Sequence, residues 1–347
     1  MKDNLTNGKP PIILNFDKVW QIMPLNRPKK ELLKSILFSA FPFIFKTFAV
    51  FQNWKNAQVF KDKTFSFWSL KFWQRSFSKS YVIRVHSEKT NEISSNTNPK
   101  LAIAIHAFYP EIFSEILQLI EKSDYKKIYL YITTPSEISK SIEEILNKSS
   151  FPFQIMNVEN RGRDILPFLK ILPKIFDDGN ELVLKLHTKK SNHLNRKDLW
   201  SNDLFNKLLG DGAINKAINI FQENPDIGII GPTKHILPMY YYYGANALTV
   251  EFLSNKMGVK KSDLSNLNFV AGSMFYATKE ALLPILNLGL KDENFEIEKN
   301  QTDGTMAHAV ERTFSAALLV NNLQLADTEY KSNKPVVLIS KAHHFSI

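Results

Sequence analysis

Cysteine is absent from the chain of 347 residues. This absence excludes disulfides, thiolate zinc sites, iron–sulfur clusters and cysteine nucleophiles. The first residues, MKDNLTNGKPPIILNF, also lack an apolar core long enough for a secretory signal, and no small-residue cleavage site follows them. We therefore expect a cytoplasmic protein.

Long apolar runs are also missing. The stretch ILFSAFPFIFKTFAVF is interrupted by Pro42 and Lys46, whereas a spanning helix needs roughly 20 apolar residues. Between residues 29 and 79, Phe and Trp alternate with Lys and Arg, a mixture that suits the lipid headgroup layer. We predict that residues 1–98 form an aromatic and basic extension with a peripheral contact at the inner face of the plasma membrane. The alternative is that these aromatics pack on the main domain.

Acidic residues are the minority charge, with 34 Asp and Glu against 44 Lys and Arg, which gives a net charge of +10. A polyanionic partner is one explanation, and solubility is the other. The chain has no zinc-finger spacing, no RRM-type aromatic motif and no long basic block, so we expect no nucleic acid. Nucleotide phosphates and anionic lipids fit better.

Neither GxGxxG nor GxxxxGK[ST] occurs, so no known phosphate-loop signature is available. From Lys100 onward, strand-like and helix-like segments instead alternate: LAIAIH, PEIFSEILQLIEK, KIYLYIT, PSEISKSIEEILNK, FPFQIMNV, DILPFLKILPKIF and ELVLKLH. This alternation predicts an α/β domain with a mostly parallel sheet and flanking helices over residues 99–330, followed by a C-terminal tail over 331–347.

An Arg-rich turn, NRGRD, leads from the third strand into a helix. Arginines and free amides at a helix start bind anions. In ELVLKLHTKK, the strand period of two places Lys185, His187 and Lys189 on one face, at the edge where ligands bind in open α/β sheets. We interpret this array as a diphosphate site formed by Asn160, Arg161, Gly162, Arg163, Asp164, Lys185, His187, Thr188, Lys189 and Lys190. The plain alternative is a polar surface turn with Asp164 as helix cap and solvated lysines.

Other candidate residues follow from strand and helix ends. His106 closes the first strand and either contacts phosphate or is structural. Gly272 and Ser273 stand in the middle of the strand-like NFVAGSMFYAT, where glycine lets the backbone approach a sugar closely. A helix through residues 304–320 is predicted to start at Thr302 or Asp303. The tyrosines at 240–243 either stack on sugar rings or pack at a loop base.

Five motifs carry a family resemblance: IHAFYPE, NRGRDILPFL, LKLHTKKS, FVAGSMFYA and TDGTMAHAVER. Together, over residues 100–320, they resemble the rhamnan synthesis protein F family. The resemblance implies a glycosyltransferase of GT-A type, in the hexosyltransferase class. It would move a sugar, with rhamnose one candidate, from a nucleotide-sugar donor to a lipid-linked bacterial surface polysaccharide such as lipopolysaccharide O-antigen or capsule. The rival hypothesis is a non-catalytic subunit that binds glycan or nucleotide.

Metal ligands are missing where the resemblance would place them. A GT-A enzyme normally ends its fourth strand in Asp-x-Asp, but here that strand ends in Lys185, Leu186, His187, Thr188, Lys189 and Lys190. The leaving diphosphate still needs positive charge in the transition state, and side-chain cations can supply it. We predict transfer without a metal or other cofactor; the alternative is Mg²⁺ or Mn²⁺ with Asp164 as a ligand.

Transfer to a sugar hydroxyl also requires a general base. Asp303 is the first candidate, since GT-A enzymes that invert the sugar often use an acidic residue at this place; its ordinary alternative is a helix cap. His308 and Glu311 lie three residues apart on one helix face and are the other catalytic candidates. Gly272, Ser273, Thr302 and Gly304 complete the predicted sugar and acceptor contacts. The sequence does not predict the oligomeric state.

Overall fold

The computed structural model describes residues 33, 36–45, 99–188, 197–243, 246–264, 267–298 and 303–331. Their central feature is a seven-stranded sheet in the order β3-β2-β1-β4-β8-β5-β9. Its strands are β1 (Leu101–His106), β2 (Ile128–Thr134), β3 (Phe153–Asn157), β4 (Leu182–His187), β5 (Ile227–Gly231), β8 (Phe275–Thr278) and β9 (Gln324–Asp327). A separate pair joins β6 (Ile236–Pro238) to β7 (Asn268–Val270).

Six of these seven strands point the same way. β1 pairs in parallel with β2 and β4, β2 with β3, and β5 with β9. Only β8 runs antiparallel, between β4 and β5. The predicted α/β class with a mostly parallel sheet is confirmed, and β8 is the departure from full parallel order.

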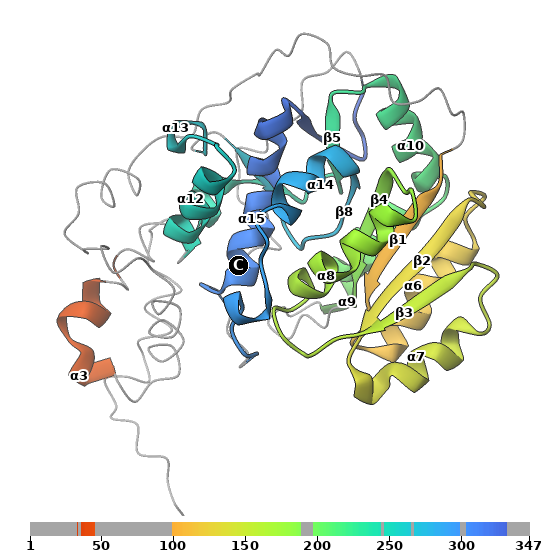
Figure 1. The fold of residues 1–347 in the computed structure, drawn as a ribbon, viewed down its shortest axis with the longest axis horizontal. Helices are drawn as coiled ribbons and strands as arrows, with labels where there is room; N and C mark the ends of the chain where they lie inside the picture. Colours follow the sequence, from red (N-terminus) through yellow and green to blue (C-terminus); the bar gives the residue numbers. More distant parts are fainter. Residues whose placement is uncertain are drawn as a thin grey trace, which may run out of the picture.

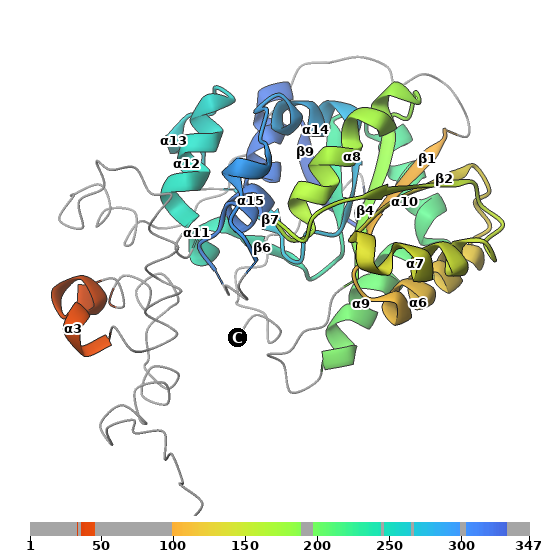
Figure 2. The ribbon, with the colours of Figure 1, turned by 60° about the horizontal axis from the view of Figure 1, so that its bottom comes forward.

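Helices cover both faces of the sheet (Figures 1 and 2). One face carries α6 (Pro110–Glu121), α7 (Ser139–Leu146), α9 (Lys197–Leu209) and α10 (Ala213–Glu223). The other carries α8 (Ile165–Asp177), α12 (Ala247–Lys256), α14 (Lys279–Leu286) and α15 (Met306–Leu318). The short helices α11 (Met239–Tyr242) and α13 (Lys261–Leu264) and the 3-10 turns Ser136–Ile138, Asp292–Asn294 and Leu319–Asn321 lie in the connections.

The period of two along β4 decides which side chains reach which face. Leu182, Leu184 and Leu186 enter the core beneath α6 and α9, whereas Val183 enters the core beneath α8. Lys185 and His187 therefore lie on the α8 face, as the alternation predicted. A charged residue thus enters an otherwise apolar layer.

Two local predictions were wrong, and a third was confirmed in position only. The predicted strand through Gly272 and Ser273 is broken there, because both residues adopt left-handed backbone angles (φ 88° and 57°) that turn the chain from β7 into β8. The α15 helix begins at Met306 with Thr305 as its cap, rather than at Thr302 or Asp303. Asp164 stands at the cap position of α8 but makes no capping hydrogen bond.

Most of the predicted extension (1–98) and tail (331–347) lies outside the described residues, as do Lys189, Lys190 and Thr302. In the extension, the described part includes α3 (Pro42–Phe45), which stands apart from the sheet in Figure 1. Within the described part of the chain, no helix is long and apolar enough to span a bilayer.

Candidate active site at the carboxyl edge of the sheet

The predicted site residues come from segments that meet at one edge of the sheet. β1 and β4 end side by side, with His106 opposite His187. The turn before α8 supplies Asp164, and β8, because it runs antiparallel, brings its beginning rather than its end to this edge. Gly272 and Ser273, which precede β8, therefore lie beside the end of β4.

Lys185 is the buried cation of this edge, with only 1% of its surface exposed. Its Nζ donates to both the carbonyl and the Oγ of Ser273 at 2.8 Å and forms an ion pair with Asp164. It also lies 5.3 Å from the centre of the Phe168 ring. An ammonium group has three hydrogens, and three protein acceptors surround it. Within the protein, Lys185 therefore serves as an internal counter-ion, and its predicted phosphate contact stays a prediction.

Asp164 is the shared acceptor of the same group. Besides Lys185, it accepts a hydrogen bond from the Ser273 Oγ at 3.0 Å, and its Oδ2 lies 3.4 Å from the His187 Nδ1. We call His106, Asp164, Lys185 and His187 the β4 cluster. A divalent metal does not fit at Asp164, because the buried ammonium beside this carboxylate would repel it.

His106 and Thr188 have structural contacts at the ends of β1 and β4. His106 Nδ1 lies 3.1 Å from the Thr133 Oγ1. Burial lowers the pKa of His106 to about 4; Asp164 opposes this shift and Lys185 adds to it. The imidazole is therefore neutral at pH 7. The Thr188 Oγ1 accepts the backbone amides of Phe108 (2.8 Å) and Tyr109 (3.0 Å), so it holds the β1–α6 loop.

The two arginines of the NRGRD turn lie against residues 292–298. Arg161 donates to the carbonyl of Asp292 at 3.1 Å, and Arg163 lies 3.7 Å from Glu298. Asn160 is exposed. Gly162 has φ 65°, and a Cβ there would stand 2.6 Å from the Leu166 Cβ. Only glycine fits at this position of the turn, between the two arginines.

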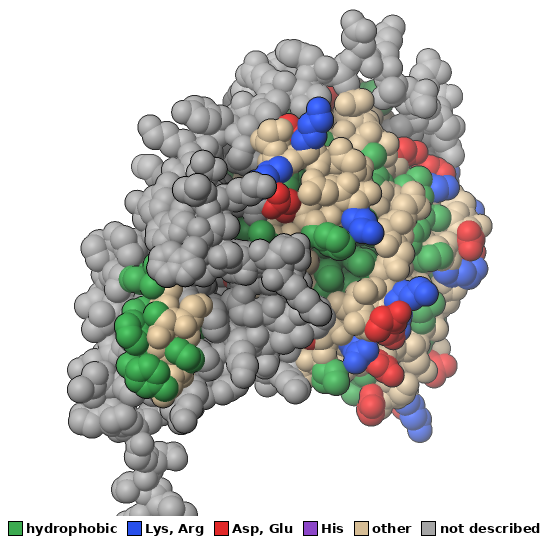
Figure 3. All heavy atoms as spheres, turned by 60° about the vertical axis from the view of Figure 1, so that its left-hand side comes forward, with side chains coloured by type: hydrophobic (Ala, Val, Ile, Leu, Met, Phe, Trp, Pro, Cys, Tyr) green, Lys and Arg blue, Asp and Glu red, His purple; other side chains and the backbone are tan. Residues whose placement is uncertain are grey.

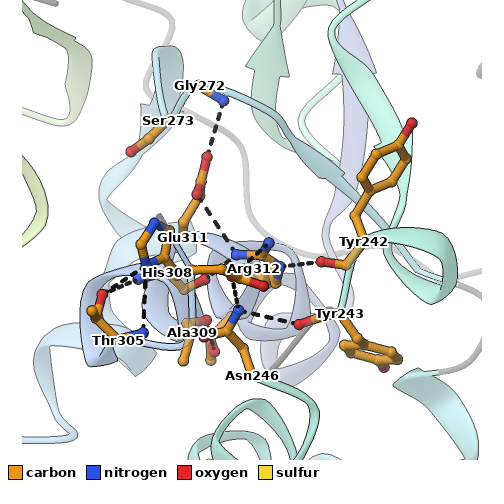
Figure 4. Close-up of polar contacts among 12 residues, drawn as sticks. Tyr242, Tyr243, Asn246, Gly272, Ser273, Thr305, His308, Ala309, Glu311 and Arg312 are labelled. Atoms are coloured by element: carbon orange, nitrogen blue, oxygen red, sulfur yellow. Dashed lines mark hydrogen bonds and ion pairs between the residues drawn. The ribbon is translucent and has the colours of Figure 1, made fainter. Parts of the chain in front are cut away.

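A second group of charges lies on α15 and faces Gly272 (Figure 4). Glu311 accepts the Gly272 amide at 2.9 Å. The Arg312 Nη1 lies 3.8 Å from Glu311, and its Nη2 lies 3.7 Å from Asp303. The two carboxylate side chains remain 18% and 17% exposed, respectively. Two carboxylates that reach the surface therefore flank one buried cation.

Arg312 is held by several further contacts that the sequence did not predict. Its Nε donates to the carbonyl of Tyr242 and its Nη1 to that of His308, both at 2.6 Å. Asn246 donates to Asp303 at 2.6 Å. We call Asn246, Asp303, Glu311 and Arg312 the α15 cluster. The only sequence signal was the Glu-Arg pair in a helix, which also suits a surface salt bridge.

His308 and Gly304 belong to the start of α15. The Nδ1 of His308 lies 2.7 Å from the Thr305 Oγ1 in a reciprocal capping arrangement. Gly304 is buried with φ 82° and lies between Asp303 and the cap. Glu296 accepts the Met306 amide with both oxygens at 3.0 Å, and burial raises its pKa. Protein groups thus already accept hydrogen bonds from the free backbone amides of Met306 and His308 at the start of α15.

Two tyrosines of the 240–243 run have described side chains, and both make contacts within the protein. Tyr242 is buried edge-to-face against Phe269, with ring centres 6.2 Å apart. The Tyr243 hydroxyl donates to the carbonyl of Leu264 at 3.1 Å. These contacts support the packing alternative over sugar stacking for these two residues.

His235 and Asp203 form a further pair that sequence reasoning missed. The His235 Nε2 lies 2.6 Å from the Asp203 carboxylate, which also binds Lys207. Burial raises the pKa of Asp203, but the bonds from Lys207 and His235 outweigh burial and leave it lowered. The carbonyl of His235 accepts the Ala271 amide at 2.8 Å. Through this bond, His235 holds the backbone of Ala271, the residue before Gly272.

Hydrogen bonds and ion pairs join both clusters into one continuous series of contacts. It runs from His187 through Asp164 to Ser273, then from Gly272 through Glu311 and Arg312 to Asp303. Across the described residues, no three His, Asp or Glu side chains gather in a way that could hold a metal ion. The edge is a connected, polar site built from side chains of both signs.

Comparison with known proteins places this site in a family. A model of the family described as rhamnan synthesis protein F matches residues 67–322. The chain belongs to the rhamnan synthesis protein F family. The match includes both clusters and begins upstream of residue 100, where the motif resemblance begins.

Two curated relatives of this chain are longer than the chain itself. Two Xanthomonas campestris pv. campestris proteins, both named uncharacterized protein WxcX and from strains B100 and ATCC 33913, are 36% identical over 223 residues. That region is 64% of this chain and 32% of each relative. The chain thus spans about a third of the curated relatives it matches.

Two solved structures show a distant likeness. A 4-diphosphocytidyl-2C-methyl-D-erythritol synthase from Anaerococcus prevotii is 11% identical, with a TM-score of 0.33, over 69% of this chain and 91% of its own. A cytidylyltransferase from Leptospira borgpetersenii is 12% identical, with a TM-score of 0.28, over 56% and 90%.

Proposed function

We propose that this chain is a glycosyltransferase of polysaccharide biosynthesis, with a GT-A-like domain. It would transfer a sugar, with rhamnose one candidate, from a nucleotide-sugar donor to a lipid-linked surface polysaccharide, with inversion. Family membership supports the pathway. The observation that carries the reaction type is the connected pair of clusters, which sets cations and two solvent-reaching carboxylates at the ligand edge of the sheet.

The β4 cluster and the NRGRD turn form the proposed donor side. A departing nucleoside diphosphate gathers negative charge, which Arg161, Arg163 and His187 would stabilise together with Lys189 and Lys190. Arg163 is only partly buried and lies 3.7 Å from Glu298, a distance at which a diphosphate can compete with the carboxylate. Lys185 would act indirectly, because it holds Asp164 and Ser273 in place.

Metal independence is part of this proposal. Its support is that Asp164, the carboxylate that contacts Lys185 and His187 at the end of β4, is already paired with the buried Lys185. We expect EDTA to leave the rate unchanged. A rate that collapses with EDTA and returns with Mg²⁺ or Mn²⁺ would contradict this part and leave the glycosyltransferase assignment standing.

The α15 cluster forms the proposed acceptor side. A sugar hydroxyl that attacks the donor must lose a proton, and Asp303 and Glu311 are the two candidate bases. Arg312 lies within 4 Å of both, so each is held in place while part of its surface reaches solvent. His308 is a less suitable base, because its Nδ1 is engaged with Thr305.

The test is to incubate purified protein with a panel of nucleotide sugars and a lipid-linked acceptor and to measure nucleoside diphosphate release. We expect release that depends on both donor and acceptor. A glycan- or nucleotide-binding subunit, which the internal ion pairs of Asp303 and Glu311 would also suit, would bind a nucleoside diphosphate without consuming any donor.

Peripheral membrane contact is proposed for the extension. On α3 and directly before it, Phe41, Phe43 and Ile44 are exposed, with 68% of Phe43 accessible (Figure 3). Apolar side chains of this kind insert at the headgroup boundary, and the net charge of +10 favours anionic lipid. Deleting residues 30–79 should abolish co-sedimentation with anionic liposomes; unchanged binding would contradict the proposal.

A further inference from the structure

Ser273 occupies the junction between the two clusters and has an unusual backbone. It is a non-glycine residue with φ 57°, a strained left-handed conformation that persists only where the surroundings hold it. Three side-chain contacts hold it: the Lys185 Nζ donates to its carbonyl and to its hydroxyl oxygen, and its hydroxyl donates to Asp164. Its amide also donates to the Val270 carbonyl at 3.3 Å. The strained residue is thus fixed by the β4 cluster.

Gly272, the residue before Ser273, is part of the same strained turn. Its φ of 88° continues the left-handed turn, and its amide donates to Glu311 at 2.9 Å. One Glu311 oxygen is oriented by this bond, while its other oxygen lies 3.8 Å from Arg312. The orientation of a candidate base therefore depends on the turn that Lys185 and Asp164 hold.

We propose that Ser273 is a positioning residue, which through its hydroxyl and the Gly272 amide couples the β4 cluster to the orientation of Glu311. In terms of the proposed function, on which this role rests, the donor-side cluster holds an acceptor-side carboxylate in its orientation along this path. Ser273 itself need not contact substrate. The sequence interpretation assigned it to sugar contact, so the role differs in kind.

Two substitutions separate the hydroxyl from the backbone strain. Ser273→Ala removes the hydroxyl and keeps a Cβ at φ 57°, whereas Ser273→Gly removes the hydroxyl and also relieves the strain. Ser254→Ala is the matched control, because Ser254 is a fully buried serine on α12 whose hydroxyl has no hydrogen-bond partner among the described residues. Ser273→Gly also secures the test if Ser273→Ala does not fold.

The first measurement does not need activity. The chain has 12 glycines, so selective ¹⁵N-glycine labelling gives a simple spectrum in which the Gly272 amide can be followed. We expect its hydrogen exchange to rise at least about tenfold in both Ser273 variants and to stay unchanged in Ser254→Ala. Unchanged Gly272 exchange in either Ser273 variant overturns the proposal, because hydroxyl loss is common to both.

The second measurement is turnover. We expect kcat of both Ser273 variants to fall at least about tenfold while the donor KM changes less than about twofold, since orientation and not binding is lost. Wild-type kcat in Ser273→Gly would overturn the role of the hydroxyl. If the wild-type protein transfers no sugar while Gly272 exchange still responds to Ser273, the glycosyltransferase proposal fails and the coupling stands.

Discussion

The β4 cluster lies at the ends of two neighbouring parallel strands, β1 and β4, and at the turn before α8, whereas the α15 cluster joins a helix to Asp303 and Asn246, which lie outside the strands. The surroundings of the buried cation also differ between the two clusters. Lys185 is surrounded by three protein acceptors, whereas Arg312 stands 3.7–3.8 Å from carboxylates that reach the surface. The first cluster is suited to holding structure, and the second keeps its carboxylates available for chemistry.

The largest effect we expect is on the acceptor side. Removing a general base costs about 10²–10⁴-fold in rate, so Asp303→Asn should lower kcat by that factor with nucleoside diphosphate affinity nearly intact. Glu311→Gln, assayed beside it, assigns the role to Glu311 if Asp303→Asn is fully active. Rates come from diphosphate release and affinities from calorimetry. Full activity in both variants would contradict the catalytic view of the α15 cluster.

On the donor side, the largest effect should be on stability. Lys185→Met leaves Asp164 without its buried partner, which costs about 3–5 kcal/mol of unfolding free energy. Lys170→Met is the control, since the Lys170–Asp292 pair is 32% and 37% exposed and is worth about 0–1 kcal/mol. Urea unfolding measures both. Equal losses would show that Lys185 is not the structural counter-ion.

Gly162 sharpens the comparison at the turn that carries the arginines. Gly162→Ala places a Cβ 2.6 Å from the Leu166 Cβ and 2.8 Å from the Phe295 ring at a positive φ, and we expect a loss of about 2–3 kcal/mol. At Gly179 the φ is also positive, but no atom stands within 4 Å. Gly179→Ala should therefore cost only about 1 kcal/mol in the same unfolding measurement.

The smallest effect concerns pH. Because the pKa of His106 falls to about 4 on folding, the unfolded chain binds the proton first as the pH drops below about 6.5. Stability is therefore lost as the pH falls from about 6.5 towards 4, by about 2 kcal/mol at pH 5. A His106→Gln variant should lack this part of the acid dependence in urea unfolding at pH 7 and pH 5. Identical slopes would contradict a neutral His106.

The donor side was the more predictable from sequence. The alternation in ELVLKLH correctly placed Lys185 and His187 on one face, because a strand fixes side-chain direction residue by residue. It could not predict that Lys185 is turned inward, since this depends on Ser273, 88 residues away. Likewise, the residues of NRGRD suggested a cap at Asp164, but the buried ammonium attracts this carboxylate away from the helix amides.

On the acceptor side, local patterns were misleading. The apolar run around Gly272 resembles one strand, yet two successive left-handed residues divide it between two sheets. Asp303 looked like a helix start because Thr-Asp-Gly precedes an apolar periodic segment, but Thr305 caps α15 together with His308. Beyond the Glu-Arg pair, no sequence pattern indicated the role of Arg312, because its contacts with Tyr242 and Asp303 lie outside its own helix.

β8 connects the two parts of the sheet. Its four residues are the strand through which two parallel blocks, β3-β2-β1-β4 and β5-β9, are joined in the described sheet. Sliding of one block past the other must first break the ladder bonds of β8, which starts two residues after Ser273. Mechanical strain between the two halves of the sheet would thus reach the Gly272 amide directly.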